Sequence, residues 1–556
     1  MVVGLSAALI ALALAGWALA DGSTSGSTVL LVGTYHGEAG QYASIQAAVD
    51  AAQPGDWILV APGDYHEADD AHATSAAQLS TGDHGGVVVT TSDIHIRGLN
   101  RNTVVVDGTK AGSPTCSAAP QDQNLGPVVG GKAQGRNGIV VWKADNVSIE
   151  NLTVCNFQGG PGDSGNQVWW NGGDGSGKLG LTGYTGSYLT GTTSFFSTES
   201  TAAEYGIFSS NAQGPGSWDQ IYGSNMNDSG MYVGACLQAC DVTIDHAWME
   251  NNALGYSGTN SGGSVVIENS QFDNNEDGVD TNSQIAGDPP PPQNGACPND
   301  GTSPITHTHS CWVFIHNNVH DNNNPDVPQA GTAAAGPIGT GMTLSGGRND
   351  TVMDNTFANN GAWGTLFIPY PDSGTPSLHQ KCENYGGFQM SGLGCVFEDT
   401  NDRLAGNTYV HDGFFGNPTN ADFGQIVLHA GLPSNCYALN DAPQGGAPPY
   451  LEVLQPTCGV PSKTTNLDGA LVTQVECDTG LASCPAGTHY PAKSGVQLEP
   501  LPRGLPTMAD PCAGVPSNAW CTSGSTSGTT ARHGGNGGHA AAAPVAAGVA
   551  YRRASL

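Results

Sequence analysis

The chain has 556 residues, of which only 12% are charged, whereas 80 are glycine. Its 48 acidic residues outnumber 16 basic ones, so the formal net charge is −32. Phosphate binding requires clustered Lys and Arg, so this balance excludes nucleic acid as an expected partner. It also disfavours an anionic polysaccharide, unless a local pocket or bound cations reverse the field.

The N-terminus begins with an apolar segment, residues 2–20, that ends in Ala18-Leu19-Ala20 before Asp21. This small-x-small ending predicts a signal peptide over residues 1–20, although no basic residue precedes the apolar run. An uncleaved membrane anchor is the alternative, because about 19 apolar residues approach the length of a bilayer span. We expect a secreted protein that keeps no stable membrane insertion after cleavage.

The even number of cysteines, 14, favours export to an oxidising compartment. Many are near neighbours in the sequence, which favours local disulfides that close loops. The predicted pairs are Cys236–Cys240, Cys297–Cys311 and Cys382–Cys395, and Cys477/Cys484 and Cys512/Cys521 are spaced in a similar way. A zinc site at Cys236 and Cys240 is disfavoured, because no second Cys/His pair lies nearby at ligand spacing.

The first element of the expected domain is a short helix. Apolar residues from Ile45 to Ala52 recur at helical spacing, so residues 43–52 are predicted to form an amphipathic helix. Pro54-Gly55-Asp56 ends the helix, and residues 57–61 are predicted to form a strand. Such a helix can cover the open end of a solenoid built from β-strands.

Beyond this helix one pattern recurs: an apolar-x-Ile strand, polar residues, an apolar residue and Asn-Asn. Copies occur at residues 241–252, 264–275 and 312–323, with looser copies at 146–157 and 350–360. A glycine then opens a second strand in each repeat: Gly206, Gly230, Gly255, Gly278, Gly341 and Gly364. A period of about 24 residues without a helical stripe predicts an all-β solenoid, a parallel β-helix, rather than a β-sandwich of antiparallel hairpins. Asn151, Asn269 and Asn317 share one phase of the repeat, which predicts a ladder of asparagines at one turn.

The segment ASIQAAVDAAQPGDWILVAPGDYHE (43–67) and the VxIxN…FxNN repeats resemble the pectin-lyase-like superfamily. More narrowly, they are similar to bacterial right-handed parallel β-helix repeat proteins of the NosD/C5-epimerase type. The resemblance covers roughly residues 29–430. It implies a right-handed parallel β-helix in a secreted setting, with carbohydrate as the usual ligand class, and it implies no particular reaction.

The composition divides the chain into four parts. Residues 1–20 are the predicted signal peptide, and residues 21–430 are the predicted β-helix. Residues 431–523 are rich in Pro, Gly and Cys, which predicts a loop-rich C-terminal cap tied by disulfides. Residues 524–556 are predicted to be a disordered tail, because Gly, Ser and Thr dominate its first half.

Long insertions predict where a site lies, because loops tolerate change and carry function. Residues 159–203 and 324–339 precede a glycine-opened strand, and residues 283–311 and 369–395 follow one. The face of these strands is therefore predicted to be the floor of a walled groove. Strand alternation points the residue two after each glycine outward: Tyr232, Ser257, Asp280 and Thr343. Trp169 and Trp170 in the first loop, with Tyr184 and Tyr188, are expected to offer flat rings for stacking on sugars.

Asp277 and Asp280 are the candidate catalytic pair, because glycosidic-bond cleavage needs at least two carboxylates. Residues 275–280, Asn-Glu-Asp-Gly-Val-Asp, are similar to the Asn-Thr-Asp-Gly-x-Asp motif of polygalacturonases, but the other motifs of that family are missing. A plain β-helix turn accounts for the same residues. Asp245, Glu268 and His316 share another repeat position and are expected to form a polar ladder on a different face.

The metal content is left open by the sequence. No Arg or Lys of the coils falls on the predicted groove floor, and Ca²⁺ could replace such a cation on an acidic substrate. The segment Gly159–Asp163 falls one residue short of a calcium-binding G-G-x-G-x-D motif and does not repeat. The leading hypothesis is a secreted monomer that binds a polysaccharide or cell-wall glycan in the groove and can cleave it as a hydrolase or lyase. The alternative is a non-catalytic surface or cell-wall module.

Overall fold

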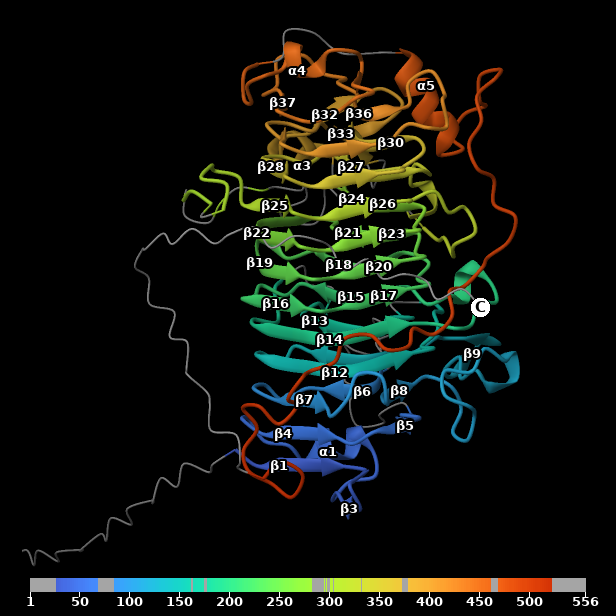
Figure 1. Cartoon of the computed structure of the whole chain (residues 1–556), viewed down its shortest axis with the longest axis vertical. Coiled ribbons are helices and arrows are strands. Elements are labelled where there is room, and N and C mark those ends of the chain that lie inside the picture. Colours follow the sequence, from blue (N-terminus) through green and yellow to red (C-terminus); the bar gives the residue numbers. More distant parts are fainter. Residues whose placement is uncertain are drawn as a thin grey trace, which may run out of the picture.

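The protein is a right-handed parallel β-helix, shown in Figure 1 as a stack of coils with the N-terminal coils at the bottom. The computed structural model describes residues 27–68, 85–161, 164–174, 178–282, 295, 297, 301–303, 305–331, 333–372, 379–461 and 469–522. The predicted signal peptide and disordered tail lie outside these residues. Within them, no helix is long and apolar enough to cross a membrane.

One strand of each coil lies in an 11-stranded parallel sheet, here called the floor sheet. Its strands, in chain order, are β6 (Gly85–Val89), β11 (Asn137–Trp142), β13 (Val168–Asn171), β15 (Tyr205–Ser210), β18 (Ser229–Gly234), β21 (Leu254–Ser257), β24 (Asp277–Asn282), β27 (Thr340–Ser345), β30 (Trp363–Ile368), β36 (Ala421–Gln425) and β38 (Gly446–Ala447). The glycines at 206, 230, 255, 278 and 341 occupy one column of this sheet, as predicted. No side chain fits there, because a Cβ at Gly206 would lie 2.4 Å from the carbonyl oxygen of Gly230.

The other two faces of the coils form one 20-stranded sheet in two series. The first series is β1 (Val29–Val32), β4 (Trp57–Val60), β7 (His95–Gly98), β12 (Val147–Cys155), β14 (Tyr184–Thr192), β16 (Gly216–Asp219), β19 (Leu237–Asp245), β22 (Ser261–Glu268), β25 (Trp312–Ile315), β28 (Asp350–Met353), β34 (Arg403–Ala405) and β37 (Cys436–Ala438). The second is β5 (Gly63–Tyr65), β8 (Val104–Asp107), β17 (Tyr222–Ser224), β20 (Trp248–Glu250), β23 (Gln271–Asp273), β26 (Asn318–His320), β29 (Thr356–Ala358) and β35 (Thr408–Val410). Residues 241–252 and 264–275 pair in parallel, which excludes the β-sandwich.

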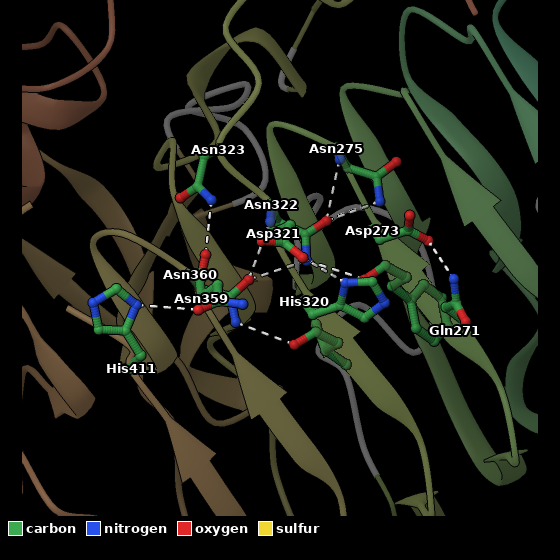
Figure 2. Close-up of polar contacts among 12 residues, drawn as sticks. Gln271, Asp273, Asn275, His320, Asp321, Asn322, Asn323, Asn359, Asn360 and His411 are labelled. Carbon is green, nitrogen blue, oxygen red and sulfur yellow. Dashed lines mark hydrogen bonds and ion pairs between the residues drawn. The ribbon is translucent and has the colours of Figure 1, made fainter. Parts of the chain in front are cut away.

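Asparagine ladders satisfy the backbone at the turns. At the turn into the floor sheet, Asn275 donates its side-chain amide to Oδ1 of Asn322 (3.0 Å), and Asn322 donates in the same way to Asn360 (3.1 Å; Figure 2). A second ladder joins Ser270, Asn317, Asn355, Asn407 and Asn440 through backbone amides that donate to the side chain on the next rung. Each amide side chain accepts and donates at once, so the interior turns stay paired without charge.

The predicted phase of these ladders needs one correction. Asn317 aligns with Ser270 and not with Asn269, because β22 and β25 pair with Glu268 opposite Ile315. Trp312 and Phe314 take the inward positions of β25 and are fully buried, so the Ile that marks the repeat in the sequence points outward there. His316 consequently falls out of the ladder expected with Asp245 and Glu268, although those two residues are neighbours on adjacent rungs.

The N-terminal end is covered by α1 (Ile45–Ala51), as predicted from its spacing. Ser44 caps this helix by accepting a hydrogen bond from the amide of Ala47. Its apolar side, Ile45, Ala48 and Val49, belongs to the main core. The fold class is therefore confirmed: stacked parallel coils closed by a short N-terminal helix.

The segment after the coils does more than cap the C-terminal end. It contains α4 (Leu451–Leu454) and α5 (Gly469–Asp478) at the top of the stack in Figure 1. Residues 489–522, here called the strap, then run back along the side of the molecule to the first coils (Figure 1). Trp520 at its end donates to the carbonyl of Glu38.

The remaining elements belong to loops. They are β2 (Thr34–Tyr35), β3 (Glu38–Ala39), β9 (Val128–Val129), β10 (Lys132–Ala133), β31 (Tyr370–Asp372), β32 (Phe388–Met390), β33 (Gly394–Phe397), η1 (Pro120–Asp122), η2 (Glu199–Thr201), η4 (Ala333–Ala335) and α3 (His379–Asn384). Disulfides close several loops, and the three predicted pairs are present: Cys236–Cys240, Cys297–Cys311 and Cys382–Cys395. Cys477–Cys484 and Cys512–Cys521 are also local, whereas Cys116–Cys155 joins separate coils and Cys436–Cys458 ties the C-terminal segment to β37.

Candidate functional site

One column of outward side chains crosses the floor sheet along the axis of the helix. On successive rungs it holds Val88, Val140, Trp169, Phe208, Tyr232, Ser257, Asp280, Thr343 and Leu366. The column is apolar and aromatic up to Tyr232 and polar from Ser257 to Thr343. Tyr232, Ser257, Asp280 and Thr343 therefore occupy successive rungs of one face.

The aromatic rungs pack on one another. Trp169 and Phe208 stack with ring centroids 5.0 Å apart and planes 9° from parallel, a separation close to the rung spacing of about 4.8 Å. Tyr232 meets Phe208 at 4.8 Å and 86°. The faces of Trp169 and Phe208 thus contact each other, and their edges form the floor. The expected stacking of a sugar on a free face of Trp169 is not available in this arrangement.

A cavity of about 330 Å³ opens beside these rings. Its lining includes Trp169, Tyr205, Phe208 and Tyr232, together with the polar side chains Asn166, Asn171, Glu204, Ser210 and Asn211. The Oδ1 atom of Asn166 is buried and has no hydrogen-bond partner. An unpaired buried acceptor is costly, and this one belongs to a residue that lines the cavity.

Trp170 and Tyr184 do not face this cavity, because residues 159–203 are not a simple loop. They contain β13 and β14, which add one coil to the helix. Strand alternation points Trp170 into the coil, where it is fully buried and donates to the carbonyl of Val147. Trp170 therefore belongs to the core and not to the substrate-binding residues, and only Trp169 points outward. The sequence VWWN lacks the glycine and the Asn-Asn turn that mark the other coils.

Asp280 lies in the polar part of the column, on β24. Ser345, on the next rung, donates to its Oδ1 at 3.3 Å. Tyr370 on β31 lies close enough that the charge of Asp280 contributes, after burial, to raising the pKa of its phenol. Asp280 is half-buried on this face.

Asp277 lies under the loop 324–339, and its exposure is 0%. Thr343 donates to its Oδ2 at 2.6 Å, and the amide of Val279 donates to its Oδ1. Burial and, after it, the charge of Asp280 raise the pKa of Asp277 well above its usual value. A substrate cannot reach Asp277 here, which corrects its expected role as a catalytic partner of Asp280. It accepts a hydrogen bond from Thr343, a buried residue of the column, and so holds that side chain in place.

Asp228 is the carboxylate that sequence reasoning missed. It precedes β18, and burial raises its pKa to about 7, while a hydrogen bond from Tyr205 opposes that rise and the charge of Asp280 adds to it. Glu204, Asp228 and Glu276 each lie two residues before a column glycine, so they share one position of the repeat. An acidic residue that recurs at this repeat position is the sequence feature from which Asp228 could have been predicted.

Loops wall this face on both sides, as far as the structure describes them. The loop 324–339 is pinned to the coils, since the amides of Ala330 and Gly339 donate to the carbonyls of Asn227 and Glu276. Ala333 packs on Leu254 at its base. On the other side, β31, β32 and β33 form a small antiparallel sheet from residues 370–397. Most of the insertion 283–311 lies outside the described residues.

A second cavity, of about 500 Å³, lies under the strap on another face. Tyr188, Tyr222 and Trp248 line it together with Arg101 and strap residues 505–507. Beside it Glu250, Asp273 and His320 occupy one column of adjacent rungs. A carboxylate–carboxylate–imidazole set therefore occurs at these residues, whereas the set expected at Asp245, Glu268 and His316 does not form, because Glu268 pairs with Ile315. Trp248 and Gln271 both donate to Asp273 (Figure 2 shows the Gln271 contact).

Metal-ligating side chains meet at the edge of the second cavity. Asp219, Asp245 and His246 lie within 4.8 Å of one another through single ligand atoms, and His246 is paired with Asp245 at 2.9 Å. The near-motif at Gly159–Asp163 is only partly within the described residues, and no ligand set is assigned to it.

No family model matches the chain, and no curated protein matches it. Among solved structures it is similar to the A-modules of the mannuronan C-5 epimerases AlgE6 and AlgE4 from Azotobacter vinelandii, at 14% and 11% identity. Each covers 71% of this chain, with 88% and 90% of the module covered and TM-scores of 0.42 and 0.40. An alginate lyase from a Paenibacillus strain is 11% identical over 76% of this chain and 96% of its own, with a TM-score of 0.32.

Proposed function

We propose that the protein is exported and binds an uncharged glycan in the cavity over Trp169, Phe208 and Tyr232. The observation that carries this proposal is a cavity lined by the edges of aromatic rings and by several polar side chains, among them Asn166. Sugars fit such a lining, because they offer hydroxyl donors beside apolar C–H surface. The seven disulfides support export, since disulfides persist in oxidising compartments.

The charge of the cavity favours a neutral sugar. Among the described residues, its lining includes Glu204 and neither Lys nor Arg, and Asp228 and Asp280 lie toward the polar end of the column. A uronate carboxylate needs a cation opposite it, and these residues offer none. We therefore expect neutral hexose or pentose polymers to bind and polyuronates to bind weakly.

The experiment is a glycan array probed with the full chain, followed by titration calorimetry on each hit. Tyr232→Ala removes the last aromatic ring of the column, next to its polar part. We expect this variant to bind the glycan about tenfold or more weakly. Trp248→Ala, in the cavity under the strap, is the matched control and should leave the affinity unchanged. Thermal unfolding of both variants checks that the coils remain intact.

Loss of binding in Trp248→Ala with full binding in Tyr232→Ala would move the site to the second cavity. Preferential binding of polyuronates would contradict the neutral-sugar part of the proposal.

Cleavage is a second candidate function, favoured by the raised pKa of Asp228. At about pH 7 this carboxyl is still partly protonated, as a general acid must be. Asp280, half-buried on the same face, is the partner carboxylate that serves as base or nucleophile. We propose this pair in place of Asp277 and Asp280, because Asp277 is enclosed.

A further inference from the structure

Three aspartates lie inside the coils near the C-terminal end of the stack. Asp350 begins β28, and Asp399 and Asp402 precede β34 on the next rung. Their exposures are 0%, 4% and 0%, respectively. Each carboxyl group influences the others, since Asp402 raises the pKa of both Asp350 and Asp399 after burial has done so.

Most of the oxygens of these carboxylates are unpaired. Asp402 accepts from the amide of Asp350 through Oδ1 (2.8 Å), and Asp399 accepts from the amide of Gly347 through Oδ1 (2.8 Å). Within the part of the chain that the structure describes, both oxygens of Asp350 and the Oδ2 atoms of Asp399 and Asp402 have no hydrogen-bond partner. A buried ionised carboxylate in this condition costs several kcal/mol, in order of magnitude, unless a positive charge meets it.

The neighbouring turns solve the same backbone problem without charge. Asp350, Asp402 and Asn435 form a column in which each backbone amide donates to the next side chain, as in the asparagine ladders. Asparagine at position 402 could accept the same hydrogen bond from the amide of Asp350 and carry no charge, and the side chain of Asp350 accepts no backbone amide among the described residues. Aspartate accepts this backbone hydrogen bond no better than asparagine does, and its charge adds the free-energy cost of desolvation. The charges therefore need another explanation.

The charge of these groups fits a cation, and two glycines let the backbone approach the carboxylates closely. Positions 295 and 347 are glycines, and the place where a Cβ of Gly347 would lie is 2.6 Å from Oδ2 of Asp350 and 3.6 Å from Oδ1 of Asp399. The corresponding place at Gly295 is 2.8 Å from Oδ1 of Asp350. Among the described residues, Arg348 is the cation whose charge acts on Asp350. The three carboxylates outnumber the one guanidinium, and Glu398, whose charge also acts on Asp399, adds to this excess of negative charge, which a divalent cation reduces.

We propose that Asp350, Asp399 and Asp402 form an internal site for a hard divalent cation of the Ca²⁺ type. Oxygen ligands are what Ca²⁺ prefers, and its flexible coordination suits a site shared by two rungs and a turn. The ion stabilises the turn at residues 346–349, which directly follows Ser345, the residue that donates to Asp280. The site is separate from the glycan cavity, and its occupancy does not depend on the proposed function.

The test compares the native chain with Asp350→Asn in CaCl2 and in EGTA. The native chain should retain about one Ca²⁺ per molecule after dialysis, measured by elemental analysis, and its Tm should rise by at least about 2 °C with CaCl2. Asp350→Asn keeps the shape of the side chain and removes a ligand charge. The variant should lose the ion and the Tm shift, and in EGTA it should be more stable than the native chain because one buried charge is gone.

Asp219→Asn is the matched control, because Asp219, Asp245 and His246 form the exposed cluster that could hold a metal instead. This variant should keep the ion and the Tm shift. If the native chain retains no Ca²⁺ and Asp350→Asn is more stable in both solutions, the aspartates are simply protonated and the proposal is wrong. It is also wrong if Ca²⁺ stays in Asp350→Asn and is lost from Asp219→Asn.

Discussion

The charge of Asp280 acts on both Asp228 and Asp277, but their surroundings give the three carboxyl groups different chemistry. Asp277 is enclosed and hydrogen-bonded by Thr343, so it has a structural task. Asp228 has a pKa of about 7 and a bond from Tyr205, which itself lines the cavity. Asp280 is partly exposed and holds Ser345. Burial, and not residue type, separates the three roles.

The first residue-scale prediction concerns cleavage of any glycan that binds. Asp228→Asn and Asp280→Asn should each lower the cleavage rate about 10²-fold or more, while binding on the array remains, because each removes one proton-transfer group. Cleavage by the native chain should fall as pH rises through about 7, since Asp228 then loses its proton. Product analysis by chromatography measures the rates.

The same rate measurements include a control variant. Asp245→Asn, on another face, should leave the rate unchanged. Full activity in Asp228→Asn would exclude that residue as the acid, and absence of any product from the native chain would leave a binding module.

The strap acts at the scale of the element. The side chain of Asn102 accepts from the backbone amide of Leu505 and donates to its carbonyl. The side chain of Asn225 makes the same two hydrogen bonds with Glu499. Asn151 accepts from the amide of Met508, and Asn251 donates to the carbonyl of Gln497. These turn residues stand on separate coils, so the strap ties distant coils together and forms one wall of the second cavity.

Releasing the strap should have a local effect. In Asn225→Gly, glycine keeps the left-handed turn conformation (φ 69°) and removes the side chain that holds Glu499. Hydrogen exchange measured by mass spectrometry should become faster over residues 493–508, whereas the global Tm changes little, because the coils keep their core. Asn359→Gly, at an equivalent turn conformation (φ 57°) away from the strap, is the control. Equal exchange in the two variants would contradict the role of Asn225.

The whole molecule combines a formal charge of −32 with many carboxyl groups buried inside the coils. Burial is the first cause that raises the pKa of Glu276 to about 8 and the pKa values of Glu398 and Asp412 to about 7. The same groups titrate near pH 4 in an unfolded chain. Between these values the folded protein binds more protons than the unfolded one, so its stability falls as pH rises.

We therefore expect the protein to be more stable at pH 5 than at pH 8. The Tm in EGTA should be several degrees higher at pH 5, measured by calorimetry at constant ionic strength. In Glu398→Gln, the side-chain oxygen still accepts from the amides of Leu428 and His429, and this variant should show a smaller difference between the two pH values. A Tm that rises from pH 5 to pH 8 would contradict the buried, protonated state of these groups.

The sequence alone determined the coil. Its glycine column, the Asn-Asn turns and the Val/Ile alternation are local features repeated at one period, and a repeat stacks only on its neighbours, so local pattern is enough to specify the fold. The N-terminal helix and the near-neighbour disulfides follow from the same local logic. The outward order Tyr232, Ser257, Asp280 and Thr343 could also be read, because strand alternation fixes it once the glycines are aligned.

Only the tertiary structure decided the register and the enclosure of each side chain. The coil that contains Trp169 and Trp170 lacks the marker residues, so its alternation could not be assigned, and Trp170 lies in the core. Trp312 and Phe314 take the inward positions of β25, so His316 lies one residue beyond the position opposite Glu268 that the sequence pattern predicted. Asp277 is closed off by a loop that follows it by about 50 residues, and the strap reaches coils several hundred residues away in the chain. Burial and pKa depend on such long-range contacts, because the groups that exclude water from a carboxylate are neighbours in space and not in sequence.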